Sequence, residues 1–81
     1  MNMISAVDSG YSDVIDVMYA ICLEGSSLAL CRSVEDTPSG IIVSYDESGR
    51  VSGVEVPDFS KRIKSDGCIL VDSAMPFMLE V

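Results

Sequence analysis

The chain has 81 residues, of which 48% are hydrophobic, and 13 acidic against 5 basic side chains give it a net charge of −8. An acidic surface repels nucleic-acid phosphates, so direct binding of DNA or RNA is disfavoured. A chain this short forms one domain, residues 1–81, and buries only about 60–65% of its unfolded surface. We therefore expect the surplus apolar side chains to be covered by self-association, most simply in a twofold homodimer.

The first 24 residues contain one clear apolar segment. Residues 1–12 show no regular pattern and are predicted to be irregular. The run Asp16–Glu24 is apolar at nearly every position, which fits either a strand covered on both faces or a buried helix segment. We favour a strand, because a Gly-Ser-Ser stretch ends the run early and a second apolar run, Leu28–Val34, follows at hairpin spacing. With the two serines at the tip, Cys22 would face Cys31, and the redox state of this pair is left open.

The segment Ile41–Val56 is the most informative in the chain. It follows the turn-forming stretch Glu35–Gly40 and reads as two β-branched strands joined by an Asp-Glu-Ser-Gly turn. In that turn Asp46 can bond its own backbone, and Gly49 supplies the positive φ that closes it. Gly53 lies inside the second strand and predicts a bulge or a close backbone approach.

The last 25 residues predict a short helix, a strand and a tail. Pro57–Lys64 can form a helical turn capped by Asp58, and Cys68–Asp72 reads as a strand. Residues 73–81 form an apolar tail, for which two positions are open: docking on its own sheet, or exchange with or docking on a second subunit. The fold class predicted is α+β and mainly β, with antiparallel hairpins forming a small sheet of four to six strands and one short helix.

Function is constrained mainly by what the chain lacks. It has no histidine, so the ordinary nucleophile–base pairs of enzymes are missing and we expect no enzyme activity. Three cysteines without CxxC spacing read as free, buried thiols, so neither a metal nor a cofactor is expected. No run approaches the roughly 20 apolar residues of a membrane span, and the start lacks a signal-peptide pattern. We expect a cytoplasmic protein without membrane contact.

Candidate binding residues fall into an apolar and an acidic group. Aromatic and methionine side chains near the helical turn and in the tail are the candidates for a subunit or partner contact. These interface candidates are Phe59, Met75, Phe77, Met78 and Leu79. The acidic candidates for facing a basic partner are Asp13, Asp16, Asp46, Glu47 and Glu55. Glu55 lies among valines, so a structural ion pair with Arg32, Arg50 or Arg62 is the alternative role for it.

The pattern Asp16-Val17-Met18-Tyr19-Ala20-Ile21, followed by the Ile41–Val56 hairpin, resembles the small prokaryotic proteins grouped as domain of unknown function 2283. The resemblance covers Asp16–Ile63. It implies a compact β-rich protein without an assigned enzyme activity. Some members of that family lie beside small toxin-like genes, which implies an antitoxin-like or partner-sequestering role.

Three functions follow as hypotheses. The first is a small acidic, homodimeric module that binds a protein partner, with a basic protein as the candidate, and is antitoxin-like by family analogy. The second is a phage-type inhibitor whose acidic surface acts on a nucleic-acid-binding defence complex. The third is an oligomeric trap for a small ligand.

Overall fold

The computed structural model describes residues 2–24 and 32–81. In chain order the elements are β1 (Asn2–Ser5), β2 (Asp8–Ser12), β3 (Val17–Ile21), β4 (Ser33–Asp36), β5 (Ile42–Tyr45), β6 (Val51–Pro57), α1 (Phe59–Arg62), β7 (Cys68–Val71) and β8 (Phe77–Glu80). The predicted class, α+β and mainly β with one short helix, is confirmed. The described residues contain no helix long and apolar enough to cross a membrane.

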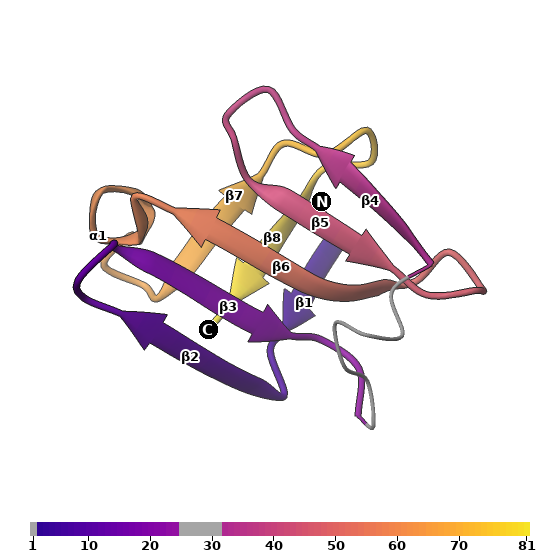
Figure 1. Cartoon of the computed structure of the whole chain (residues 1–81), viewed down its shortest axis with the longest axis horizontal. Helices are drawn as coiled ribbons and strands as arrows, with labels where there is room; N and C mark the ends of the chain where they lie inside the picture. Colours follow the sequence, from indigo (N-terminus) through magenta and orange to yellow (C-terminus); the bar gives the residue numbers. More distant parts are fainter. Residues whose placement is uncertain (1, 25–31) are drawn as a thin grey trace.

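The strands form two stacked sheets (Figure 1). The front sheet in this view has the order β2-β3-β6-β5-β4 and is antiparallel throughout. Behind it lies a sheet of order β1-β8-β7, in which β8 runs antiparallel to β7 and parallel to β1. The chain thus folds as a small sandwich rather than as the single sheet that its hairpins predict.

The core lies between the two sheets. Side chains alternate across each strand, so every second residue of β3, β6, β7 and β8 points inward. The front sheet contributes, among others, Val43 and Val56, and the rear sheet contributes Val71 and Leu79, all with no measurable exposure. The other members of the cluster are Met18, Ala20, Cys22, Ile41, Val54, Ile69 and Phe77.

The hairpin predicted over Ile41–Val56 is confirmed as β5–β6. Asp46 Oδ1 accepts hydrogen bonds from the backbone N–H of Ser48 and of Arg50, each at 2.9 Å, and Gly49 has a φ of 79°. Gly53 pairs with Ser44, and the register shifts at the next pair, which indicates the expected bulge.

Both ends of the chain form strands of the fold. Residues 1–12 are not irregular, because residues 2–5 and 8–12 form β1 and β2. For the tail, two positions were open, and the structure shows docking on its own sheet: residues 77–80 form the central strand of the rear sheet. Strand β8 pairs with β1 on one side and β7 on the other, contacts that sequence periodicity cannot assign.

The hairpin predicted between residues 16–24 and 28–34 is wrong in its pairing. Strand β3 pairs with β2 and β6, whereas β4 pairs with β5, so two strands separate β3 from β4. The predicted tip and the facing of Cys22 with Cys31 lie outside the described residues. The turn assigned to Glu35–Gly40 is shorter, because Glu35 and Asp36 belong to β4.

Candidate protein-binding surface

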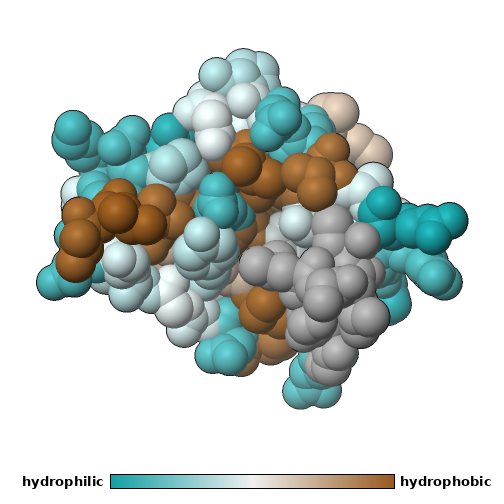
Figure 2. Space-filling view, viewed as in Figure 1, coloured by the Kyte–Doolittle hydropathy of each residue, from teal (hydrophilic) through white to brown (hydrophobic). Residues whose placement is uncertain are grey.

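Large apolar side chains protrude from the turn that joins β2 to β3. Val14 is 89% exposed and Ile15 is 63% exposed. Turns are usually made of Gly, Asn, Asp, Ser or Pro. A β-branched apolar side chain that stays exposed to water in a turn contributes no burial free energy to folding. Figure 2 shows an apolar cluster at the end of the molecule where β2 meets β3. Because the fold does not bury them, these side chains are the first candidates for a contact with another molecule.

Two aromatic rings lie next to this turn. Tyr11, at the edge of β2, is half-exposed, and its ring lies 5.3 Å from that of Phe59 in α1, with an interplanar angle of 49°. A tilted pair at this distance is a favourable aromatic arrangement. We call the group Tyr11, Val14, Ile15 and Phe59 the apolar tip.

Asp16 fixes the position of the apolar tip on the fold. Its Oδ1 accepts hydrogen bonds from the Tyr11 hydroxyl at 2.8 Å and from the Ser60 N–H at 3.0 Å, and its Oδ2 accepts from the Ser60 hydroxyl at 2.7 Å. Its backbone oxygen accepts from the N–H of Phe59. One residue thus ties the β2–β3 turn to α1.

These bonds shift two pKa values. The hydrogen bonds from Ser60, joined by the one from Tyr11, lower the pKa of Asp16 below its ordinary value because they stabilise the carboxylate. The same contact raises the pKa of Tyr11, since ionising that hydroxyl would remove the hydrogen bond to Asp16 and place two negative charges together. Asp16 therefore stays ionised and Tyr11 stays neutral near neutral pH.

The cap predicted for the helical turn is corrected. Asp58 occupies the N-cap position, but its φ is 52° and its side chain makes no capping hydrogen bond. Asp16, distant in sequence, supplies the acceptors instead. Asp16 itself has a φ of 53°. Two non-glycine residues with left-handed backbone thus flank the apolar tip, a conformation that aspartate tolerates better than most residues.

Two exposed acidic side chains are sequence neighbours of residues in the apolar tip. Asp13 is exposed within the turn, and Asp58 is exposed at the start of α1, with Lys61 one turn later. An apolar centre with a charged rim is the usual anatomy of a protein–protein interface. The predicted residues Asp13, Asp16 and Phe59 therefore come together at one end of the molecule.

The other acidic candidates lie elsewhere. Asp46 and Glu47 are in the β5–β6 turn, at the opposite end of the front sheet (Figure 1). Asp46 forms a salt bridge with Arg50 at 2.9 Å and has a lowered pKa, mainly because the Arg50 backbone N–H bonds its carboxylate. These acidic candidates thus lie at two opposite ends of the front sheet.

Glu55 lies on the outer face of the front sheet, where β6 pairs with β3. The structure places it opposite Tyr19 rather than beside an arginine. The hydrogen bond between the Tyr19 hydroxyl and the Glu55 carboxylate raises the pKa of Tyr19. Arg50 and Arg62, two of the predicted partners, bond to Asp46 and Ser39 instead.

The interface candidates of the tail divide by strand face. Phe77 and Leu79 are 3% and 0% exposed and belong to the core, so their assignment to an interface is corrected. Met78 points the other way, between Met3 on β1 and Leu70 on β7. These three form a methionine row across the outer face of the rear sheet, in which Met3 is 55% and Leu70 45% exposed. Met75, 84% exposed, lies in the loop before β8.

Sequence reasoning missed Tyr11, Val14 and Ile15. A signal was available, because Asp13-Val14-Ile15-Asp16 places two β-branched residues between two turn-forming acids. Val14 and Ile15 were assigned to no element, because the predicted strand begins at Asp16. Residues 1–12, assigned as irregular, concealed the strand that places Tyr11 beside α1.

Cysteine and metal chemistry add little to this surface. Burial raises the pKa of the Cys22 thiol to about 11, and Cys68 is also buried with a raised pKa for the same reason. Among the described residues no group of three or more His, Cys, Asp or Glu side chains is placed to hold a metal ion.

Comparisons of the chain with models of protein families, with curated proteins and with solved structures found no match. The resemblance of Asp16–Ile63 to domain of unknown function 2283 therefore stays a prediction.

Proposed function

We propose that this chain is a non-enzymatic protein-binding module that contacts its partner through the apolar tip. The observation that carries the proposal is the exposure of Val14 and Ile15 in a turn held rigidly by Asp16. Burying an exposed Val or Ile side chain contributes about 1.5–3 kcal/mol. Preorganisation by the Asp16 hydrogen bonds reduces the ordering cost of binding.

The partner has an apolar pocket with basic side chains around it. Asp13 and Asp58 at the rim of the apolar tip, within a chain of net charge −8, favour encounter with a positively charged surface. The same charge disfavours nucleic acid and anionic membranes as direct targets. The resemblance to domain of unknown function 2283 adds an antitoxin-like, partner-sequestering role in the cytoplasm.

The proposal includes a homodimer formed through the methionine row. Met78 lies at the centre of the row, and a twofold axis near it would bring Met3 and Leu70 of one chain against the same residues of the other. Flexible methionines adapt to such a self-complementary contact. This leaves the apolar tip, on another part of the fold, free for the partner.

Affinity measurements test the proposed contact. A tagged chain is expressed in its own host, and the protein that co-purifies is purified and titrated calorimetrically. We expect Val14→Ser with Ile15→Ser to weaken binding by about 2 kcal/mol or more. Val34→Ser, which removes a 57% exposed valine from β4, is the control and should bind as the wild type does. Equal affinities for all three proteins would contradict the proposal.

Light scattering tests the dimer. The expected mass is twice the 8.7 kDa of the chain. Met78→Lys should give a monomer, while Met75→Lys, a methionine outside the row, should remain dimeric. A monomeric wild type at high concentration would remove the dimer from the proposal without affecting the apolar tip.

A further inference from the structure

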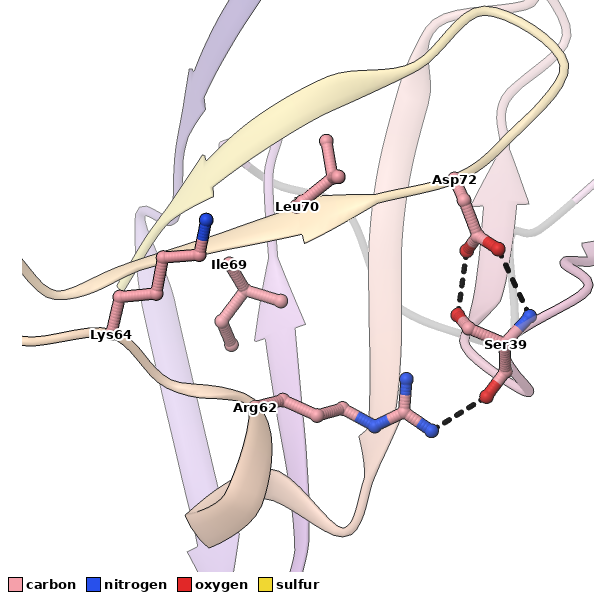
Figure 3. Close-up of a pocket in the computed structure, with 6 residues that line it drawn as sticks. All are labelled: Ser39, Arg62, Lys64, Ile69, Leu70 and Asp72. Carbon is pink, nitrogen blue, oxygen red and sulfur yellow. Dashed lines mark hydrogen bonds between the residues drawn. The ribbon is translucent and has the colours of Figure 1, made fainter.

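A cleft opens between the end of α1, the edge strand β7 and the β4–β5 turn. Its volume is about 300 Å³, and it is lined by Ser39, Arg62, Lys64, Ile69, Leu70 and Asp72 (Figure 3). Pockets that bind small molecules start at about this size. The cleft includes Arg62 at the end of α1, whereas the apolar tip includes Phe59 at its start, and the cleft shares Leu70 with the methionine row.

The cleft concentrates positive charge in an acidic protein. Two of the chain's five basic residues, Arg62 and Lys64, line it, against one acid, Asp72. Asp72 makes no direct ion pair with Arg62 in the described structure: its two oxygens accept hydrogen bonds from the Ser39 N–H at 2.9 Å and the Ser39 hydroxyl at 2.6 Å. These bonds also hold the pKa of Asp72 below its usual value.

The guanidinium of Arg62 is only partly satisfied. Its Nη2 donates to the backbone oxygen of Ser39 at 2.6 Å, as Figure 3 shows. Its Nε–H is buried and has no hydrogen-bond acceptor among the described residues. Such a group is rare in folded proteins and calls for an explanation. Arginine matches carboxylates in geometry and keeps its charge at every physiological pH.

Apolar side chains complete the cleft. Ile69 is 1% exposed, and Leu70 is 45% exposed on the strand that borders the cleft. In Figure 3 the Arg62 side chain extends toward Ser39, while Lys64 lies on the other side of Ile69. A ligand with its charge at Arg62 therefore has a hydrocarbon wall beside it and a second cation beyond that wall.

We propose that this cleft binds a small organic carboxylate, with the carboxylate group on Arg62 and a short alkyl group against Ile69 and Leu70. The three sides of the cleft come from α1, β7 and the β4–β5 turn. This site uses none of the apolar-tip residues, and it shares Leu70 with the methionine row.

Nuclear magnetic resonance of the full ¹⁵N-labelled chain tests the site with butanoate as the probe. We expect saturable shifts at the amides of Ile69, Leu70 and Ser39 and at the side-chain Nε–H of Arg62. Acetate should bind more weakly, because it lacks the alkyl group, and butylamine, which matches in length but is cationic, should not bind. Absence of saturable shifts, equal binding of butylamine, or phosphate binding as tightly as butanoate would overturn the proposal.

Two variants on neighbouring positions separate a specific site from general charge attraction. Arg62→Gln should weaken butanoate binding by at least roughly tenfold, since it removes a charge-assisted hydrogen-bond donor. Lys61→Gln makes the same charge change on α1 at a residue that does not line the cleft, and should bind as the wild type does. Equal weakening by both would overturn the proposal. Lys64→Gln, at an exposed position, supplies a second test if Arg62→Gln does not fold, with a smaller loss expected.

Discussion

Leu79→Ala tests whether β8, near the end of the chain, is the central strand of the rear sheet. Leu79 has no measurable exposure and pairs with Ile4 of β1 and Ile69 of β7. Truncating a fully buried leucine to alanine costs about 2–5 kcal/mol, the lost transfer free energy together with the cavity left behind. A chain of 81 residues has a free energy of unfolding of only about 4–12 kcal/mol. The substitution should therefore remove a large part of the stability.

Leu70→Ala is the matched control, because Leu70 lies on the adjacent strand and is 45% exposed. We expect its loss of stability to be less than half that of Leu79→Ala. Urea unfolding followed by circular dichroism measures both, and repeating it at two protein concentrations separates any loss of self-association. Equal losses for the two variants would refute the reasoning, since they would mean that β8 does not occupy the centre of the sheet.

Three further predictions concern single positions. Gly49→Ala should lower the free energy of unfolding by about 1–2 kcal/mol in the same urea assay, because an L residue at a φ of 79° is strained. Gly10→Ala is the control and should lower it far less, since Gly10 has no positive φ and equally open space around it. Similar losses for the two variants would argue against the turn. Wild-type stability should fall as the pH drops below about 4. The reason is that Asp16 has a lowered pKa in the folded state, so its contribution is present above the unfolded pKa and is lost as pH falls through the folded one. Asp16→Asn should flatten that profile, and an unchanged profile would count against its bonds to Ser60. Cys22, with a pKa of about 11 and 8% exposure, should be alkylated slowly at pH 8 until urea is added, as peptide mapping would show, and fast native labelling would contradict its burial.

Local signals in the sequence predicted the local structure well. The Asp46–Gly49 turn, the β5–β6 hairpin around it and strand β7 follow from turn chemistry and β-branched runs, which depend on neighbours in sequence. The fold class follows from the same runs. Gly53 was also interpreted correctly, because a glycine inside a strand has few structural roles.

Long-range pairing was not predictable from these signals. Strand β1 is parallel to β8 across the full length of the chain, and no local pattern encodes that contact. The run that contains β3 suggested a hairpin with its sequence neighbour, yet β3 pairs with β6. Asp58 met the sequence rule for a helix cap, but Asp16 takes that role through tertiary structure.

The candidate site shows the same division. Asp13, Asp16 and Phe59 were selected from the sequence, but for their charge or aromatic character rather than for their proximity. Phe77 and Leu79 were assigned to an interface because a short apolar tail commonly docks on another molecule, and both are buried in the core. Exposure, which identifies Val14 and Ile15, depends on the turn geometry and not on residue type.

Site-specific photocrosslinking in the host tests the central claim most directly. A benzophenone amino acid in place of Val14, the most exposed residue of the apolar tip, should crosslink to one discrete protein with a basic surface. The same group in place of Glu47, at the far end of the front sheet, should not. Crosslinking of that protein from position 47 alone, or of no protein from position 14, would contradict the account.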